Sequence, residues 1–185
     1  MLEGKLVNLR KVEKEDVDFQ FACANDLDFW GEYTHPVFEQ VPKWYLMQLV
    51  ENYPNDFQKA LEDKPFIIQK KDGTKVGLMW QFTNQPYGTL EFSGFLVPSE
   101  RGKGYGAEAT QLMVDYLFLS KDIVRIQTDT NAGNKEAQKT LKKVGFQIEG
   151  TIRKNQLVRG VWNDFYLLSI LRDEWKEPKI LTKTA

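Results

Sequence analysis

The chain has 185 residues, a net charge of -1 and 42% hydrophobic residues, so we expect a single domain, residues 1–185, with a core of its own. The near-neutral charge provides no global field that would attract nucleic acid or an anionic membrane surface. Cys23 is the single cysteine and His35 the single histidine. An internal disulfide and a zinc site built from these residue types are therefore excluded, and we expect no metal.

The N-terminal residues lack the apolar run of a signal peptide. No stretch of the chain reaches the roughly 18 apolar residues of a membrane-spanning helix. We therefore expect a cytoplasmic protein that has no membrane partner.

The first half of the chain predicts a strand, a helix and a hairpin. Residues 5–12 alternate as a strand does, and residues 13–26 carry apolar residues on one helical face. Residues 26–63 have an irregular, aromatic-rich pattern. Two apolar segments then flank Asp72 and Gly73, a pair typical of a hairpin turn, so residues 64–70 and 75–83 are predicted to pair.

The second half predicts a longer alternation of strands and helices. Residues 89–97 read as a strand in which Gly94 indicates a bulge or a close backbone approach. After it we predict a loop, a helix over 107–120, a strand over 123–130, a helix over 134–145, and strands over 146–154 and 163–175, with polar residues 155–162 as a loop or hairpin connection. The order favours a mixed α/β fold around one largely antiparallel sheet. The central strand-loop-helix-strand unit must pair its strands in parallel or splay them.

Three glycines at alternate positions, Gly102, Gly104 and Gly106, precede the helix over 107–120. The spacing fits the dinucleotide fingerprint G-x-G-x-x-G/A, with Asp129 as a ribose-binding acid. Four residues, however, separate the strand from the first glycine, where the dinucleotide turn is tight. The repeated β-α-β units of a doubly wound sheet are also missing.

A second interpretation is a pyrophosphate site. Backbone amides in such a turn, backed by a helix N-terminus, bind phosphate groups well. The charges of Arg101 and Lys103 would strengthen that binding. A turn without any ligand is the remaining alternative.

Residues 101–106, Arg-Gly-Lys-Gly-Tyr-Gly, preceded by Phe-Leu-Val-Pro, resemble the acetyl-CoA loop of the GNAT superfamily of N-acetyltransferases. Residues 131–146 resemble that family's asparagine-to-Gly-Phe helix. Residues 149–153 and 160–175 resemble the closing strands of the RimJ/RimL-like branch, which acetylates ribosomal-protein N-termini. The resemblance implies a GNAT fold, α/β (α+β), with one central, mostly antiparallel mixed sheet that has a V-shaped splay and is flanked by helices.

The resemblance implies acetyl-CoA as co-substrate, with no metal. Its diphosphate would lie on the loop formed by Arg101, Gly102, Lys103, Gly104, Tyr105, Gly106 and Ala107. The pantetheine arm would add like a strand beside the backbone of Phe95, Leu96 and Val97. Asn134 matches the asparagine that bonds the CoA arm, although it also suits a helix N-cap. Lys139 and Lys142 either approach the 3′-phosphate or form a solvated helix face.

The implied reaction is direct acetyl transfer from a thioester to a primary amine. The amine must first lose a proton, and its pKa is roughly 10 for an alkyl amine and near 8 for a protein N-terminus. The oxyanion needs a donor, which the amide of Leu96 or Val97 would supply. Because Cys23 falls in the first predicted helix, away from the loop, we expect no covalent enzyme intermediate.

The sequence departs from the family at the catalytic acid. Leu141 stands where many members have a tyrosine, and Ala137 stands where the branch often has a serine. The candidate catalytic residues are therefore Glu91, Ser93 and Glu32. Further alternatives are Tyr33 and Tyr166 as proton donors, His35 as a base, and water with no side-chain base at all.

The sequence leaves four classes of acceptor: a protein N-terminus, a polyamine, an aminoglycoside and a small metabolite amine. Residues 26–63 are expected to form the acceptor side. There, Glu32 and Glu39 favour a cationic acceptor, and aromatic residues form either a cleft wall or core: Trp30, Tyr33, Phe38, Trp44 and Tyr45. The alternative to an enzyme is a CoA-binding sensor or interaction module of the same fold. A homodimer is possible by resemblance.

Overall fold

The computed structural model describes residues 1–34, 41–51, 65–82 and 88–181. In this part of the chain, eight strands form one sheet in the order β1-β2-β3-β4-β5-β6-β8-β7. The strands are β1 (Leu2–Glu3), β2 (Val7–Lys11), β3 (Phe66–Lys70), β4 (Lys75–Phe82), β5 (Thr89–Leu96), β6 (Arg125–Asn131), β7 (Gln147–Val158) and β8 (Val161–Leu171). All neighbouring pairs are antiparallel except β5 and β6, which are parallel. The predicted mixed, mostly antiparallel sheet is confirmed.

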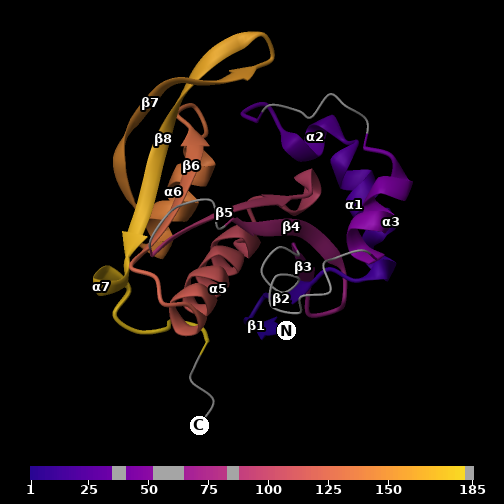
Figure 1. The fold of residues 1–185 in the computed structure, drawn as a ribbon, viewed down its shortest axis with the longest axis horizontal. Coiled ribbons are helices and arrows are strands. Elements are labelled where there is room, and N and C mark those ends of the chain that lie inside the picture. The colour runs from indigo at the N-terminus through magenta and orange to yellow at the C-terminus, as the bar shows by residue number, and fades with distance from the viewer. Residues whose placement is uncertain (35–40, 52–64, 83–87, 182–185) are drawn as a thin grey trace.

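Helices cover both faces of this sheet. On one face, α1 (Val17–Ala24), α2 (Leu27–Trp30) and α3 (Lys43–Glu51) pack over a small cluster that includes Ile67 and Leu78. On the other face, α5 (Tyr105–Ser120) and α6 (Lys135–Val144) pack over the main core. In Figure 1, β4 and β5 cross the middle of the molecule, between α1–α3 on the right and β6–β8 on the left.

In the strands, the structure decides between two pairs of alternatives and corrects one expectation. Residues 155–162 continue β7 and β8 instead of forming a separate connection, because the two strands turn tightly at Arg159 and Gly160, both with positive φ. Residues 172–175 form the short helix α7 rather than the end of a strand. At Gly94 the β4–β5 register runs without a shift, so there is no bulge. A Cβ there would lie 2.9 Å from the Cε of Met79, which explains the glycine by close packing.

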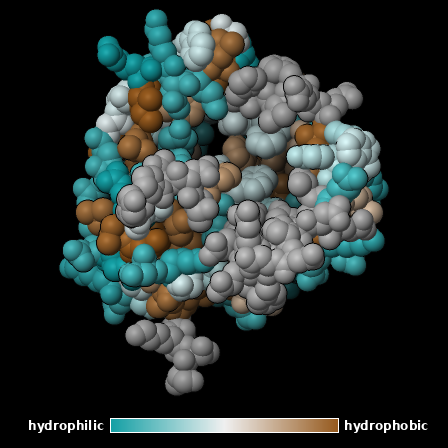
Figure 2. Space-filling view, viewed as in Figure 1, coloured by the Kyte–Doolittle hydropathy of each residue, from teal (hydrophilic) through white to brown (hydrophobic). Residues whose placement is uncertain are grey.

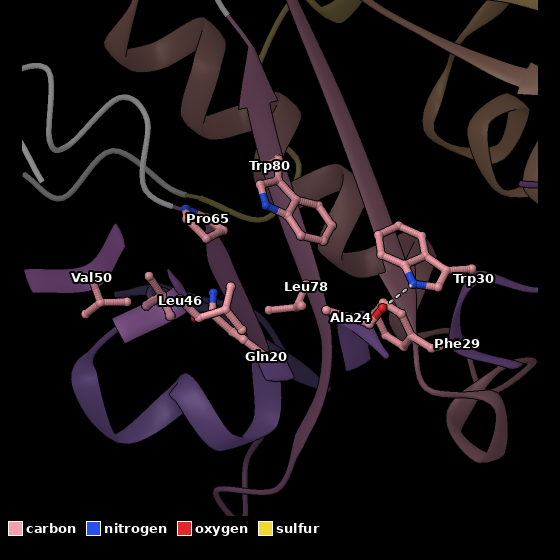
Figure 3. A pocket seen from close by; sticks show the side chains of 10 residues that line it. Gln20, Ala24, Phe29, Trp30, Leu46, Val50, Pro65, Leu78 and Trp80 are labelled. Carbon is pink, nitrogen blue, oxygen red and sulfur yellow. Dashed lines mark hydrogen bonds between the residues drawn. The ribbon is translucent and has the colours of Figure 1, made fainter. Parts of the chain in front are cut away.

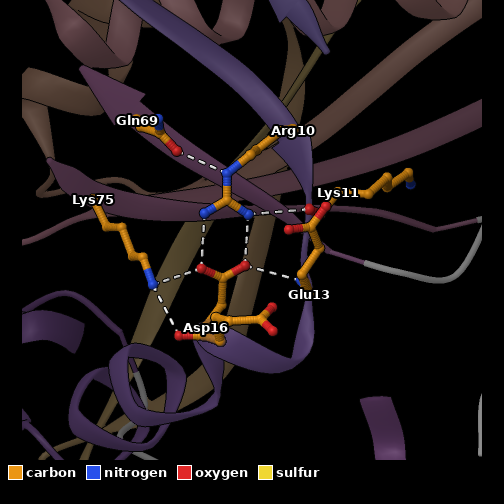
Figure 4. A network of polar contacts seen from close by, with 7 residues as sticks. Arg10, Lys11, Glu13, Asp16, Gln69 and Lys75 are labelled. Carbon is orange, nitrogen blue, oxygen red and sulfur yellow. Dashed lines mark hydrogen bonds and ion pairs between the residues drawn. The ribbon is translucent and has the colours of Figure 1, made fainter. Parts of the chain in front are cut away.

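A buried carboxylate, Asp16, connects the start of α1 to two strands (Figure 4). The guanidinium of Arg10, on β2, donates to both carboxylate oxygens at 2.6 and 2.8 Å. The ammonium of Lys75, on β4, lies 2.6 Å from the same group. Burial alone would raise the pKa of Asp16, but the hydrogen bonds from Arg10 and Lys75 lower it to about 2. The α1 side of the molecule is therefore held by charged side chains.

A second buried carboxylate, Asp115 on α5, binds the C-terminal segment. Its oxygens accept from the indole N–H of Trp175 at 2.9 Å and from the amides of Lys179, Ile180 and Leu181 at 2.8–3.2 Å. The tail after β8 is thereby joined to the main core. Among the described residues, no helix combines the length and apolar character needed to cross a membrane.

Candidate active site

The sheet opens between its two central strands. β5 and β6 pair only where Thr89, Leu90 and Glu91 face Arg125, Ile126 and Gln127. Beyond Glu91, β5 continues to Leu96 beside β4, whereas β6 continues to Asn131 beside β8. The two strands therefore diverge into a V, and the space-filling view is hollowed between the two sides of the molecule (Figure 2).

The open edge of β5 offers backbone groups to this space. The amide of Val97 donates to the carbonyl of Val76 on the β4 side at 2.9 Å. Since successive residues of a strand point their polar groups to opposite sides, Val97 and Phe95 bond toward β4, and Leu96 and Gly94 face the splay. Of the three residues predicted to lie along the pantetheine arm, Leu96 is the one whose amide is directed there.

The glycine loop ends at the N-terminus of α5. Gly102 and Gly104 have φ values of 76° and 87°, which other residues adopt only with strain. The first bond within α5 runs from the amide of Glu108 to the carbonyl of Gly104. The amides of Tyr105, Gly106 and Ala107 therefore have no partner within the helix. These donors and the positive end of the helix dipole fit a diphosphate.

The two cationic side chains of the loop point elsewhere. The guanidinium of Arg101 donates to the carbonyls of Leu96, Asp28 and Phe29 at 3.1, 2.9 and 2.7 Å. The ammonium of Lys103 pairs with Glu100 at 3.0 Å. Arg101 therefore joins α2 to the end of β5. The loop therefore offers mainly backbone donors to the opening.

Asn134 caps α6, since its side-chain oxygen accepts from the amide of Ala137 at 3.1 Å. Its side-chain nitrogen contacts no acceptor among the described residues, so the cap leaves a donor for a ligand. Leu141 is buried in the main core, where a side chain reaches no solvent. Lys139 pairs with Glu136 at 2.7 Å on the exposed face of α6, which favours the solvated-face interpretation.

Two carboxylates lie on one sheet face where the splay begins. Glu91 is half-buried on β5. Its burial, and to a smaller extent the negative charge of Asp129, raise the pKa of its carboxyl. Asp129, on β6, is exposed as a whole residue, yet partial burial of its carboxyl raises its pKa, and a hydrogen bond from Asn155 opposes this shift. The Asn155 nitrogen lies 3.2 Å from the Asp129 carboxylate. Both carboxylates therefore bind a proton more readily than ordinary ones.

Sequence reasoning considered Asp129 only for the dinucleotide alternative and missed Asn155. The register of β7 shifts between Ile152 and Gln156, and this irregularity brings Asn155 to Asp129. The sequence of residues 155–162, predicted as a connection between strands, contains no signal for the contact between Asn155 and Asp129. The sequence did allow β5 and β6 to pair in parallel, and that pairing places Asp129 near Glu91. This was the signal by which Asp129 could have been found.

The other predicted side chains are dispersed. Ser93 lies opposite Trp80 on the same sheet face as Glu91. Glu32 is exposed, and its carboxylate accepts a hydrogen bond from the hydroxyl of Tyr33. This bond, and then the negative charge of Glu32, raise the pKa of Tyr33. The carbonyl of Tyr33 accepts from Asn131 at 3.4 Å, so this segment spans from α2 to the end of β6. Tyr166 packs against the main core, on the opposite face from Glu91.

The aromatic residues that the structure describes on the predicted acceptor side do not gather in one wall. Trp30 packs with Phe29 and Phe95, and Phe95 also packs with Trp80, whereas Trp44 and Tyr45 are exposed. His35, Phe38 and Glu39 lie outside the described residues. Cys23 is buried on the inner face of α1, and burial raises the pKa of its thiol to about 12, so it is a poor nucleophile.

Comparison with known proteins agrees with this geometry. The model of the acetyltransferase (GNAT) domain family matches residues 7–147. The chain is 28% identical to a probable N-acetyltransferase, YjcK, of Bacillus subtilis over 181 residues, which cover 94% of this chain and 98% of the relative.

Two solved structures share the fold. The spermidine N-acetyltransferase of Vibrio cholerae, in complex with CoA and spermine, superposes with a TM-score of 0.80 at 19% identity, covering 93% of this chain and 99% of the other. RimJ of Mycobacterium smegmatis, in complex with CoA-disulfide, has a TM-score of 0.79 at 20% identity, with coverage of 93% and 85%. The splayed sheet, the glycine loop and these matches together show that the chain belongs to the GNAT family and is an N-acetyltransferase.

Proposed function

We propose that the chain transfers the acetyl group of acetyl-CoA directly to a primary amine, and that residues 1–185 act as one domain. The observation that carries the proposal is the splay between β5 and β6, which leads to the free amides at the start of α5. The diphosphate lies on the backbone of residues 101–107, and the pantetheine arm follows the β5 edge at Gly94 and Leu96. Asn134 supports the arm with its free side-chain nitrogen.

The acceptor enters from the face that carries Glu91 and Asp129. The two carboxylates attract the ammonium form of the amine, and Glu91 takes its proton directly or through water. The raised pKa of Glu91 reduces the difference from the amine's pKa, which favours this transfer. The neutral nitrogen then attacks the thioester carbon, and the amide of Leu96 donates to the carbonyl oxygen. The C–S bond breaks, and the nitrogen releases its second proton to solvent as it becomes the amide. The CoA thiolate leaves and takes up a proton from solvent.

No thiol intermediate takes part in this scheme. Cys23 is buried with a raised pKa, and it lies in the cluster beneath α1 rather than along the β5 edge. Burst kinetics, or an acetyl adduct on Cys23 detected by mass spectrometry, would contradict direct transfer.

The test is release of the CoA thiol from acetyl-CoA with a panel of acceptors. The panel holds spermidine, a short peptide with a free N-terminus, an aminoglycoside and small aliphatic and aromatic amines. We expect turnover with at least one of them and acetylation at a primary amine. Binding of acetyl-CoA by calorimetry with no acceptor modified would favour the sensor alternative, and absence of binding would refute the proposal.

A further inference from the structure

An apolar pocket lies between the helices α1–α3 and the sheet (Figure 3). Its volume is about 140 Å³, close to the roughly 150 Å³ of an engineered apolar cavity that binds benzene. Phe29, Trp30 and Trp80 line it together with aliphatic side chains of α3 and β4. None of the described residues that line it is charged. The pocket therefore suits one aromatic ring better than a polycation.

One polar side chain interrupts this lining. Gln20, on the inner face of α1, is 8% exposed. Its Oε1 is buried and has no hydrogen-bond partner among the described residues. Burying an acceptor without a donor is unfavourable. An occupant that brings an N–H or O–H group removes this cost.

The indole of Trp30 does not provide a donor for the Gln20 oxygen. The Nε1 of Trp30 already donates to the carbonyl of Ala24 at 3.2 Å (Figure 3). This bond also fixes the ring, which meets Phe29 edge to face at 5.6 Å between centroids. In the described part of the chain, the pocket thus has aromatic walls, of which Trp30 is held by a hydrogen bond, and a buried acceptor at Gln20 that lacks a donor.

The pocket adjoins the splay. Phe95, on β5, lies 5.1 Å from Trp30 and 6.1 Å from Trp80 between ring centroids. Phe95 directly precedes Leu96, whose amide faces the opening between β5 and β6. A ring held by these walls therefore lies beside the strand along which acetyl-CoA is proposed to bind.

We propose that this pocket binds a single aromatic ring bearing one hydrogen-bond donor, with Gln20 Oε1 accepting the bond. The ring is either the body of the acceptor amine or a separate small effector. A ring that belongs to the acceptor amine rests on the proposed acetyltransferase function. The binding of a ring in the pocket does not depend on that function.

Phenol and benzene are the matched probes for ring binding, measured by ligand-observed NMR without acetyl-CoA. The wild type is expected to bind phenol about 5-fold more tightly than benzene, as one neutral hydrogen bond allows. Gln20→Leu is expected to bind both equally, with benzene affinity kept. Equal binding by the wild type, a phenol preference that survives in Gln20→Leu, or no binding of either probe would overturn the proposal.

Thermal unfolding shows whether Gln20→Leu is folded, and its midpoint is expected to rise because an unpaired acceptor has been removed. Should it fail to fold, Gln20→Met replaces it, since methionine has nearly the same length and offers only a weak acceptor. The same phenol-to-benzene ratio then decides.

Acetylation kinetics separate the two sources of the ring. Tyramine carries the hydroxyl and phenethylamine lacks it. If the ring belongs to the acceptor, the wild type prefers tyramine in kcat/KM by about 5-fold, Gln20→Leu loses the preference, and phenol competes with tyramine. Phenol binding without competition supports a separate effector. If no amine is acetylated but phenol still binds through Gln20, the proposed acetyl transfer fails and the ring site stands.

Discussion

The proposed donor side and the proposed acceptor side of the site are built from different parts of the chain. On the donor side, backbone amides at the start of α5 and at Leu96 face the opening, and the charged side chains of Arg101 and Lys103 are bonded elsewhere. On the proposed acceptor side, the surface consists of side chains from separate elements, among them Glu91, Asp129 and the aromatic residues around Gln20.

This difference indicates that side-chain substitutions are tolerated differently on the two sides of the site. A backbone site depends on glycine conformations within a few consecutive residues, so it tolerates side-chain changes but not a Cβ at the wrong position. A side-chain site can change its specificity by substitution while the fold is kept. We therefore expect donor mutants to lose the cofactor and acceptor mutants to change rate or preference.

The largest expected effect is on the support of the acceptor side. Asp16→Asn removes a buried carboxylate that joins α1 to β2 and β4, and we expect a loss of about 3 kcal/mol in the free energy of unfolding. Urea denaturation measures it. Asp72→Asn, at an exposed pair with Lys70, is the matched control and should leave stability unchanged. A similar small effect at both positions would contradict the role of Asp16.

The same pair gives a pH test. The pKa of Asp16 is about 2 in the folded chain, below its ordinary value of 3.8. Its contribution is therefore present above about pH 4 and lost as the pH falls toward about 2. The difference in stability between the wild type and Asp16→Asn should shrink over that window. A constant difference would show that the carboxylate is not the stabilising group.

The next largest effect tests the donor side. Gly104→Val places a Cβ at a φ of 87°, beside the amides that are proposed to bind the diphosphate. We expect acetyl-CoA affinity to fall about 100-fold, from strain and steric intrusion together. Calorimetry measures it. Gly73→Val carries the same strain, at a φ of 89° in the β3–β4 turn, and should keep normal affinity. Unchanged affinity in Gly104→Val would disprove the diphosphate assignment.

Glu91→Gln tests the acceptor side directly. We expect kcat to fall about 10- to 100-fold, as for loss of a general base, with unchanged affinity for acetyl-CoA. The defect should diminish as the pH approaches the pKa of the amine, because solvent then deprotonates it. Glu136→Gln, on the exposed face of α6, should behave as the wild type. A pH-independent defect would assign Glu91 a role in position rather than in proton transfer.

The smallest expected effect is a gain in stability. The raised pKa of Asp129 means that its ionised form is disfavoured in the folded chain. Asp129→Asn should therefore increase the free energy of unfolding near neutral pH, and the gain should be small because solvent screens the charge of this exposed side chain. The gain should disappear below the ordinary pKa of the carboxyl, and turnover should fall. Lower stability in this variant would mean that the bond from Asn155 outweighs the cost of the charge.

The sequence by itself predicted the sheet, its main helices and the glycine loop. Alternating apolar residues, the Asp72-Gly73 turn and the loop glycines are local signals, since each depends on the conformation of a few neighbouring residues. The length of the β7–β8 hairpin escaped prediction, because the residues that pair near its turn are mostly exposed. Their apolar members, Leu157 with Trp162 and Val158 with Val161, do not alternate with polar residues as a strand pattern would. The helix at 172–175 escaped for a related reason: Arg172 bonds three carbonyls near the end of α5, a contact made across the fold.

For the proposed site, the sequence indicated the glycine loop of the donor half, and tertiary structure decided which amide of β5 faces the opening and which residues form the acceptor half. The amides that face a diphosphate follow from consecutive residues around Gly104. Which amide of β5 faces the splay depended on its register with β4. The meeting of Glu91 with Asp129, and of Gln20 with Trp30 and Trp80, depended on elements distant in the chain being packed together. Contacts of that kind are properties of the folded core, because no short segment contains both partners.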